Sequence, residues 1–236
     1  MSTIHFIRHG QASFGSKDYD RLSGLGRDQA LRLGEYLAGN DTVFDAVYSG
    51  SLRRQTETAE IVMGALKGTG PVPSIEVARD FDEYDSAGVF KAVAGDMIEE
   101  DPGLSDRLSR ILTDHKEFQK IFEEMVNRWV AGRHRRPVAE SWREFTRRVR
   151  RGLDGVMGVC GSGKQVAVFT SAGTLSAVMQ KALDLSDERA VGVSWTVYNS
   201  SVSVFRYSAD KRFGLCSFNS VAHLEIHRDA GLITYR

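Results

Sequence analysis

The chain has 236 residues, 42% of them hydrophobic, which is enough for one sizeable core with an insertion but too short for several independent domains. Lysine plus arginine and aspartate plus glutamate both number 31, so no global basic field favours nucleic acid or a membrane surface as a partner. Cys160 and Cys216 lie far apart without CxxC spacing, and neither a signal pattern nor an apolar run of ~18 residues is present, so we expect a soluble protein of the reducing cytoplasm.

The first half of the chain alternates β-rich runs with helical patterns. In residues 24–39, Leu25, Ala30, Leu33 and Leu37 fall roughly on one face of a helix, which predicts that this face is buried. The predicted elements are, in order, a buried strand at 3–7, this helix at 24–39, a strand at 44–50 and a helix at 51–66 that GTGPVP ends.

The middle of the chain has a different pattern. Residues 87 to about 130 are polar and mostly helical, with no convincing strand, which predicts a helical insertion at about 87–135. A further helix is expected from about residue 140 to 157. Its apolar residues recur at steps of three and four and form a core-facing stripe made of Trp142, Phe145, Val149, Leu153 and Val156.

The last third returns to alternating strands and helices. We predict a strand at 165–171, a helix at 174–185, and a hairpin formed by strands at 200–207 and 213–219. Short β-rich runs separated by helices are typical of a parallel sheet. The sequence therefore predicts a single α/β domain, 1–236, built as a three-layer sandwich with a mostly parallel central sheet and the helical insertion over its C-terminal edge.

A segment near residue 160 imitates a nucleotide-binding loop. Residues 158–165, GVCGSGKQ, have the G-x-x-x-x-G-K spacing of a P-loop, which works where a strand ends and a helix begins. Here a predicted helix precedes the segment and a strand follows it, and Gln165 stands where a magnesium-binding Ser or Thr is needed. We interpret the segment as a glycine-rich turn from helix to strand.

Residues 133–151 hold eight arginines, a pattern that could bind a polyanion. The apolar stripe of the same helix occupies its other side, no aromatic platform alternates with the charges, and the net charge is zero. These features favour a solvated helix face, although Arg133, Arg135 and Arg136 precede the helix and could reach an anionic substrate.

Four carboxylates crowd into residues 79–86, RDFDEYDS: Asp80, Asp82, Glu83 and Asp85. Hard cations favour such clusters, so a metal site is one interpretation. The others are a solvated acidic turn, or one carboxyl acting as a general acid over an active site.

Polar side chains gather where three predicted strands end. Arg8 and His9 follow the first strand, Ser49 ends the second, and residues 170–173 end a later one; in an open α/β sheet, ligands bind at this edge. Arg54 falls in the first turn of the next helix, where free amides and the helix dipole already favour an anion. Guanidinium groups bind phosphate bidentately, and a neutral imidazole beside them can attack phosphorus.

In these segments the sequence resembles the histidine phosphatase superfamily, also called phosphoglycerate mutase-like. Its most specific motif is the RHG signature in FIRHGQAS. The resemblance covers nearly the whole chain apart from the helical insertion. The other segments that carry it are RLSGLGRDQA at 21–30, YSGSLRRQTETA at 48–59, FDEYD at 81–85, VFTSAGTLSAV at 168–178 and FNSVAHL at 218–224.

The resemblance implies a role for each matching residue. His9 is the phosphorylated nucleophile, Arg8 and Arg54 hold the phosphoryl oxygens, and Glu83 protonates the leaving oxygen and then helps to activate water. No metal or organic cofactor is implied. The weaker candidates for contact with substrate are Gln11, Ser49, Ser171 and Ala172.

Two positions depart from the family pattern, one in the turn after the late strand and one at the start of the helix at 51–66. The family uses a second catalytic His in an S-H-G-G-like turn, where this chain has Ser171 followed by Ala172. A hydroxyl donates one hydrogen bond but brings no positive charge. Gln55 stands where the family usually has Ala. His223 could substitute for the missing imidazole, but its ending is a common structural feature, so we assign it to the core or to the residues directly behind the site.

The mutase branch of the family continues R-H-G-E-S-x-W-N, whereas this chain has Gln11, Ala12, Phe14 and Gly15. We therefore expect a phosphomonoester hydrolase that acts slowly on a small phosphorylated metabolite, ahead of a phosphoglycerate-type mutase. The alternative from another class is a catalytically weak phospho-ligand-binding or interaction protein. The sequence identifies neither the substrate nor the oligomeric state. A dimer is among the oligomeric states that it allows.

Overall fold

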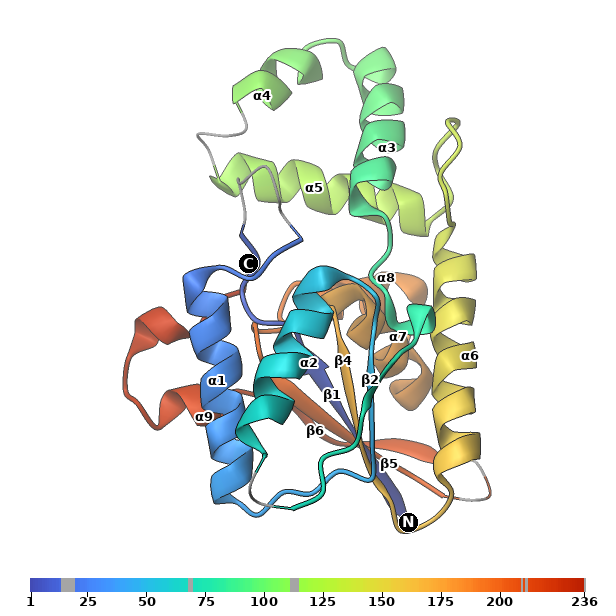
Figure 1. The fold of residues 1–236 in the computed structure, drawn as a ribbon. Coiled ribbons are helices and arrows are strands. Elements are labelled where there is room, and N and C mark those ends of the chain that lie inside the picture. Colours follow the sequence, from blue (N-terminus) through green and yellow to red (C-terminus); the bar gives the residue numbers. More distant parts are fainter. Residues whose placement is uncertain (14–19, 68–69, 111–114, 209, 211, 236) are drawn as a thin grey trace.

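The computed structural model describes residues 1–13, 20–67, 70–110, 115–208, 210 and 212–235. Phe14 and Gly15, which distinguish the chain from the mutase pattern, lie outside the described residues. The central sheet has six strands in the order β3–β2–β4–β1–β5–β6 (Figure 1). The strands are β1 (Ser2–Arg8), β2 (Ala46–Ser49), β3 (Ile75–Val77), β4 (Gln165–Thr170), β5 (Val202–Tyr207) and β6 (Phe213–Ser220).

The middle of the sheet is parallel and buried on both sides. β1 pairs with β4 in parallel, with Ile4 opposite Val166 and Phe6 opposite Val168. All four side chains are fully buried, as expected for parallel strands that helices cover on both faces. β2 and β3 continue the parallel part, whereas β5 pairs antiparallel with β1 and with β6. The mostly parallel sheet and the β5–β6 hairpin were both predicted from the sequence.

Helices cover the two faces of the sheet and make three layers. One face carries α1 (Gly24–Gly39) and α2 (Arg53–Ala65), whose Leu33 and Val62 share a hydrophobic cluster with Ile7 and Phe169 of the sheet. The opposite face carries α6 (Trp142–Cys160) and α7 (Ala172–Leu183), whose cluster includes the stripe predicted for α6. Leu25 departs from the predicted stripe of α1, because it packs against the C-terminal cluster instead.

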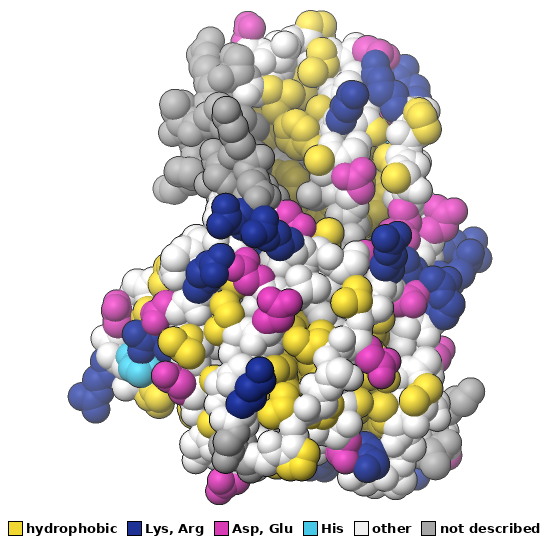
Figure 2. Space-filling model, viewed as in Figure 1, with side chains coloured by type: hydrophobic (Ala, Val, Ile, Leu, Met, Phe, Trp, Pro, Cys, Tyr) yellow, Lys and Arg dark blue, Asp and Glu magenta, His cyan; other side chains and the backbone are white. Residues whose placement is uncertain are grey.

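The helical insertion consists of α3 (Ser86–Glu100), α4 (Leu104–Arg110) and α5 (His115–Val130) and lies beyond the C-terminal ends of the parallel strands (Figure 1). Met125 and Trp129 of α5 are fully buried and belong to the same cluster as Phe6 and Phe145, so the insertion packs on the core. Figure 2 shows hydrophobic side chains gathered in a hollow of this upper part of the molecule.

Several elements differ from the prediction at their ends or were missed. The sequence did not predict β3 or α8 (Asp187–Ser194), because β3 has only three residues, two of them exposed, and α8 has only two buried residues. Helix α7 begins at Ala172, two residues earlier than expected. Residues 158–165 form the end of α6 and a turn into β4. This confirms the interpretation of the segment as a turn from helix to strand and not as a P-loop. The short elements that complete the fold are η1 (Arg79–Phe81), α9 (Ala222–Glu225) and η2 (Ala230–Leu232).

The C-terminal residues return to the end of β1. Thr234 O accepts a hydrogen bond from Asn199 N at 2.8 Å, and Thr234 Oγ1 donates to Asn199 Oδ1 at 2.9 Å. Gln29, fully buried in α1, donates through Nε2 to Leu232 O at 2.8 Å. The last residues therefore pack between α1 and the segment that precedes β5. Of the helices in the described part of the chain, none combines the length and apolar character that crossing a bilayer requires.

Candidate active site

The backbone around His9 is fixed from three sides where β1 ends. His9 N donates to Thr170 O at 2.9 Å, and His9 O accepts hydrogen bonds from Ser200 N at 3.1 Å and Asn199 Nδ2 at 3.3 Å. Gly10 then passes so close to α1 that a Cβ on it would lie 2.2 Å from the carbonyl oxygen of Gly26. The glycine of the RHG motif is therefore a steric requirement of this turn.

The imidazole of His9 is held with one nitrogen available for chemistry. Its Nδ1 lies 2.7 Å from Gly10 O, which can only accept, so Nδ1 carries the proton in the neutral ring. The unprotonated Nε2 accepts a hydrogen bond from Arg54 Nε at 3.2 Å. Burial, followed by the charges of Arg54 and Arg8, lowers the pKa of His9 well below its usual value. The ring is therefore neutral and nucleophilic at physiological pH.

Two guanidinium groups flank this imidazole. Arg8, the last residue of β1, donates from NH1 to Val197 O. Arg54, in the first turn of α2, forms an ion pair with Asp20, with 2.6 Å between NH1 and Oδ1. The other oxygen of Asp20 accepts from Arg53 N at 2.8 Å, so this carboxylate caps the helix. Asp20 was not identified from the sequence, because its partners are more than 30 residues away.

The carboxyl group of Glu83 reaches the opposite side of the site. Its Oε2 accepts from Gly173 N at 2.9 Å and its Oε1 from Tyr84 N at 3.1 Å. A Cβ on Gly173 would lie 2.1 Å from Glu83 Oε1, so the side chain can approach α7 only because residue 173 is glycine. Burial raises the pKa of Glu83, and this effect outweighs the lowering by these hydrogen bonds and by Arg54. A raised pKa suits a carboxyl group that must deliver a proton.

The segment that precedes Glu83 is bound to the β4–α7 turn. Thr170 Oγ1 donates to Phe81 O at 2.7 Å, and Thr174 Oγ1 donates to Asp82 O at 3.0 Å. Both threonines are fully buried. The end of β4 and the start of α7 therefore hold Glu83 in two ways. Gly173 binds its carboxylate, and the two threonines fix the backbone of the residues that precede it.

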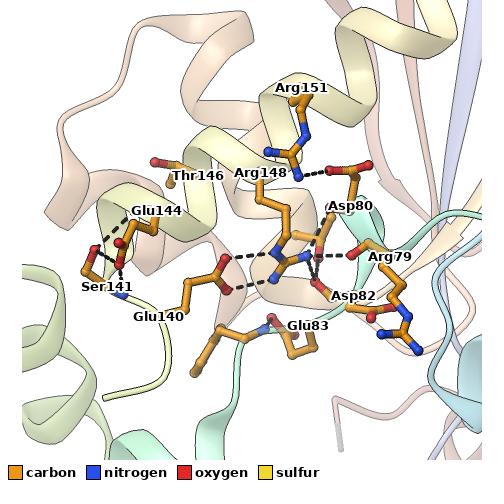
Figure 3. Close-up of polar contacts among 12 residues, drawn as sticks. Arg79, Asp80, Asp82, Glu83, Glu140, Ser141, Glu144, Thr146, Arg148 and Arg151 are labelled. Atoms are coloured by element: carbon orange, nitrogen blue, oxygen red, sulfur yellow. Dashed lines mark hydrogen bonds and ion pairs between the residues drawn. The ribbon is translucent and has the colours of Figure 1, made fainter. Parts of the chain in front are cut away.

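Arg148 of α6 holds the same segment from the other side (Figure 3). Its NH1 donates to Arg79 O at 2.8 Å and to Asp80 O and Asp82 O at 3.1 Å each. Its Nε and NH2 donate to the two oxygens of Glu140, both at 2.8 Å. The arginine-rich helix is thus not only a solvated face as predicted, because one of its arginines clamps the loop of the acid.

The other arginines proposed as substrate contacts are occupied elsewhere. Arg136 NH1 lies 2.7 Å from Asp96 Oδ1 of α3, and Arg135 NH2 lies 2.8 Å from Glu99 Oε2. Neither they nor Arg133 line the pocket described below. Arg135 and Arg136 instead pair with carboxylates of the insertion, so contact between this segment and a substrate stays a prediction.

The four clustered carboxylates do not converge on one point. Asp80 pairs with Arg151 at 2.6 Å, Asp82 Oδ2 accepts from Ser51 Oγ at 2.8 Å, and Asp85 caps α3 by accepting from a backbone amide. Among the described residues, no group of three or more His, Cys, Asp or Glu side chains could hold a metal ion. Of the interpretations considered for this run, the geometry fits a general acid best.

The two departures from the family pattern lie in contact with each other. Ser171 and Gln55 are 1% and 0% exposed, and Gln55 Nε2 donates to Ser171 Oγ at 2.8 Å. Gln55 Nε2 also donates to Phe81 O at 3.2 Å. The larger glutamine thus fills space beside the smaller serine, and the pair joins α2, α7 and the segment before Glu83.

Three further candidates face away from the pocket. Ser49 is fully buried and donates to Gly50 O at 2.8 Å, and Gln11 Oε1 accepts from Ser23 Oγ at 2.8 Å. His223 is buried 2.8 Å from Ser200 Oγ, and burial lowers its pKa to about 4. Because Ser200 N binds His9 O, His223 supports the backbone of the site instead of replacing an imidazole in it.

A pocket of about 1320 Å³ opens above these groups, at the edge of the sheet that the insertion covers. Of the residues proposed from the sequence, it brings together Arg8, His9, Arg54, Glu83 and Ala172. Its other walls come from α3, α5, the segment after α8, β6 and the C-terminal residues. The aromatic side chains among them, which the sequence analysis did not identify, are Tyr84, Phe90, Phe122, Trp195, Tyr198, Phe218 and Tyr235.

A neutral buried imidazole between two guanidinium groups, with a protonatable carboxyl across the site at the carboxyl edge of an α/β sheet, is an arrangement suited to phosphoryl transfer. A profile of the histidine phosphatase superfamily (branch 1) matches residues 4–101 and 83–219. The chain therefore belongs to the histidine phosphatase superfamily, as its motifs indicated.

The relatives include phosphatases and a mutase. The mitochondrial serine/threonine-protein phosphatase Pgam5 of Caenorhabditis briggsae is 36% identical over 81 residues, which are 34% of this chain and only 28% of that protein. Phosphoserine phosphatase from Entamoeba histolytica superposes with a TM-score of 0.64 at 17% identity, covering 95% of this chain and 100% of that one. Phosphoglycerate mutase from Bacillus anthracis superposes with a TM-score of 0.64 at 17% identity and 97% coverage of both chains. At these identities the structural likeness shows the fold alone.

Proposed function

We propose that the protein hydrolyses phosphomonoesters through a phosphohistidine formed on His9. The observation that carries the proposal is the state of the imidazole, which is buried, neutral, and bound through Nδ1 to Gly10 O so that Nε2 keeps its lone pair. A nucleophile in this setting splits one difficult displacement into two easier ones. Membership of the histidine phosphatase superfamily supports the same chemistry.

In the first step, His9 Nε2 attacks phosphorus and the bond to the ester oxygen breaks. The proton of Glu83 goes to the leaving oxygen, which departs as the alcohol. In the second step, the Glu83 carboxylate takes a proton from water as the water oxygen attacks phosphorus. The P–N bond breaks, its electron pair returns to Nε2, and inorganic phosphate leaves. Arg8 and Arg54 offset the charge on the phosphoryl oxygens throughout.

We rank hydrolysis above mutase activity, because a mutase must also bind a second phosphate and exclude water. The described residues that line the pocket include only two cationic side chains, Arg8 and Arg54, and both adjoin His9. A small phosphorylated molecule is the proposed substrate. The predicted slow rate rests on Ser171, which supplies a hydroxyl where the family pattern has a second imidazole. A cytoplasmic location stays a prediction.

Trapping of the phosphoenzyme tests this proposal. The wild type, His9→Asn and the control His227→Asn, which changes an exposed histidine, are each mixed with an aryl phosphate labelled with ³²P. We expect an acid-labile label and release of phosphate from the wild type and the control, and neither from His9→Asn at an unchanged melting temperature. Turnover in His9→Asn contradicts the covalent mechanism. A wild type that binds phosphate without turnover supports the phospho-ligand-binding alternative.

A further inference from the structure

The pocket is much larger than a phosphate group. Its volume of about 1320 Å³ exceeds the range of ~300–1,000 Å³ that is common for small-molecule sites. The groups of the proposed reaction occupy one corner, which we call the phosphate corner: Arg8, His9, Arg54 and Glu83. A compact metabolite bound there would leave most of the pocket walls without contact.

The walls above the phosphate corner are aromatic. Phe122 of α5 and Trp195, directly after α8, meet edge to face with 5.6 Å between ring centroids. Tyr198 and Tyr235 pack with their rings tilted at 37° and their centroids 4.6 Å apart, and the Tyr235 hydroxyl donates to the Tyr198 hydroxyl at 3.1 Å. We call these four residues the aromatic wall. Since the rings of each pair pack on one another, the wall is ordered before a ligand arrives, which reduces the entropy cost of binding.

The charges of the described lining residues are all in the phosphate corner. Beyond it, the polar side chains of the lining are neutral, and they include Gln119, Thr196, Asn199 and Asn219. A second carboxylate or phosphate on the substrate would therefore lose water without gaining a cation from the described lining, which is costly. An apolar group would instead bury its surface against the rings at a gain of ~25 cal/mol per Å².

We infer that the substrate is a phosphate monoester of a bulky alcohol that carries an aromatic group and no second anion. This inference rests on the proposed hydrolysis and specifies which esters it favours. The phosphate corner holds the phosphoryl group, and the aromatic wall binds the ring of the alcohol. Aromatic rings favour offset or edge-to-face contact at centroid separations of ~4.5–7 Å, the same spacing that the wall residues adopt among themselves.

The test compares esters whose leaving groups have similar basicity: ethyl phosphate, 2-phenylethyl phosphate, 2-(naphthyl)ethyl phosphate and phosphoserine. We expect kcat/KM to rise on the order of tenfold with each added ring. Most of this gain is expected in KM, because the distal contacts are the same in the ground and transition states. Phosphoserine is expected to be slower than 2-phenylethyl phosphate.

Trp195→Leu should reduce the preference for the naphthyl ester over ethyl phosphate on the order of tenfold. Tyr36→Leu, an aromatic change on α1 outside the pocket lining, is the matched control and should keep the preference. The wild-type ratio tests the inference even if Trp195→Leu fails to fold.

Equal kcat/KM for ethyl and naphthyl esters, or a preference for phosphoserine, overturns the inference while leaving the hydrolase proposal standing. A phosphoserine peptide is assayed beside these esters, and a preference for it overturns the inference in favour of a protein substrate. Absence of turnover with every ester contradicts the proposed function itself.

Discussion

The phosphate corner and the aromatic wall form two ends of one pocket by different means. In the corner, backbone hydrogen bonds and close contacts hold each group, as with His9, which is fixed by Thr170, Ser200 and Asn199. In the wall, side chains from separate elements pack through their rings. The proposed reaction therefore depends on rigid backbone geometry, whereas the proposed choice of substrate depends on side chains that can change without disturbing that geometry.

The largest effect is expected for Arg54 in the phosphate corner. Arg54→Lys keeps the charge but loses the planar fork that reaches His9 and Asp20 together. We expect kcat/KM to fall roughly 10²–10³-fold for every ester, whatever its alcohol. Inhibition by inorganic phosphate should weaken in parallel. Arg53→Lys, next in sequence and exposed, is the control; equal phosphate inhibition of both variants would exclude Arg54 from the phosphate site.

A smaller and more selective effect is expected for Glu83. Glu83→Gln should slow alkyl esters by about 10²-fold, the lower end of the range for a general acid, and aryl esters much less, since a good leaving group needs little protonation. Because burial raises the pKa of Glu83, activity should persist above the usual pKa of a glutamate and fall as the pH rises through the raised value. The variant should lack this alkaline decline. The control is Asp85→Asn, which keeps the cap of α3. Equal slowing of both ester types would mean that Glu83 only positions the site.

The smallest effect concerns the Gln55–Ser171 pair beneath the corner. Both side chains are buried and in contact, so Ser171→His alone should lower the melting temperature without raising kcat. The double change Gln55→Ala with Ser171→His removes the filling side chain and should raise kcat by about tenfold, less than the full value of one charged donor. Gln55→Ala alone is the control. A single Ser171→His variant that is faster and equally stable would contradict this reasoning.

Three groups of the phosphate corner could be proposed because each lies in a short local pattern, whereas Glu83 was selected among its acidic neighbours only by the family resemblance. Arg8 and His9 follow an apolar run that must be a buried strand, and Arg54 follows another at the start of a helix. The sequence order of strands and helices also predicted the three layers. Gln11 and Ser49 belong to the same patterns, but their side chains form hydrogen bonds with neighbouring residues outside the pocket. Adjacency in sequence does not determine the direction in which a side chain points.

The rest of the site depends on contacts between distant segments. Arg148 resembles the other arginines of its helix. The one sequence feature that could have indicated its contact with the loop of Glu83 is its position directly before Val149, at the border of the apolar stripe. The aromatic wall joins residues 122, 195, 198 and 235, which no local pattern connects. Gly173 looked like part of a loose turn, whereas its missing side chain is what lets Glu83 approach α7.

The return of the C-terminal residues to the pocket has a practical consequence for handling the protein. Ile233, Thr234 and Tyr235 form part of the pocket rim, while the N-terminus lies at the opposite end of the sheet (Figure 1). A fluorophore, affinity tag or surface tether attached near Tyr235 would sit at the entrance and compete with ligands for the rim. The same attachment at Met1 would leave the entrance clear, so immobilisation and fusion designs should use the N-terminal end.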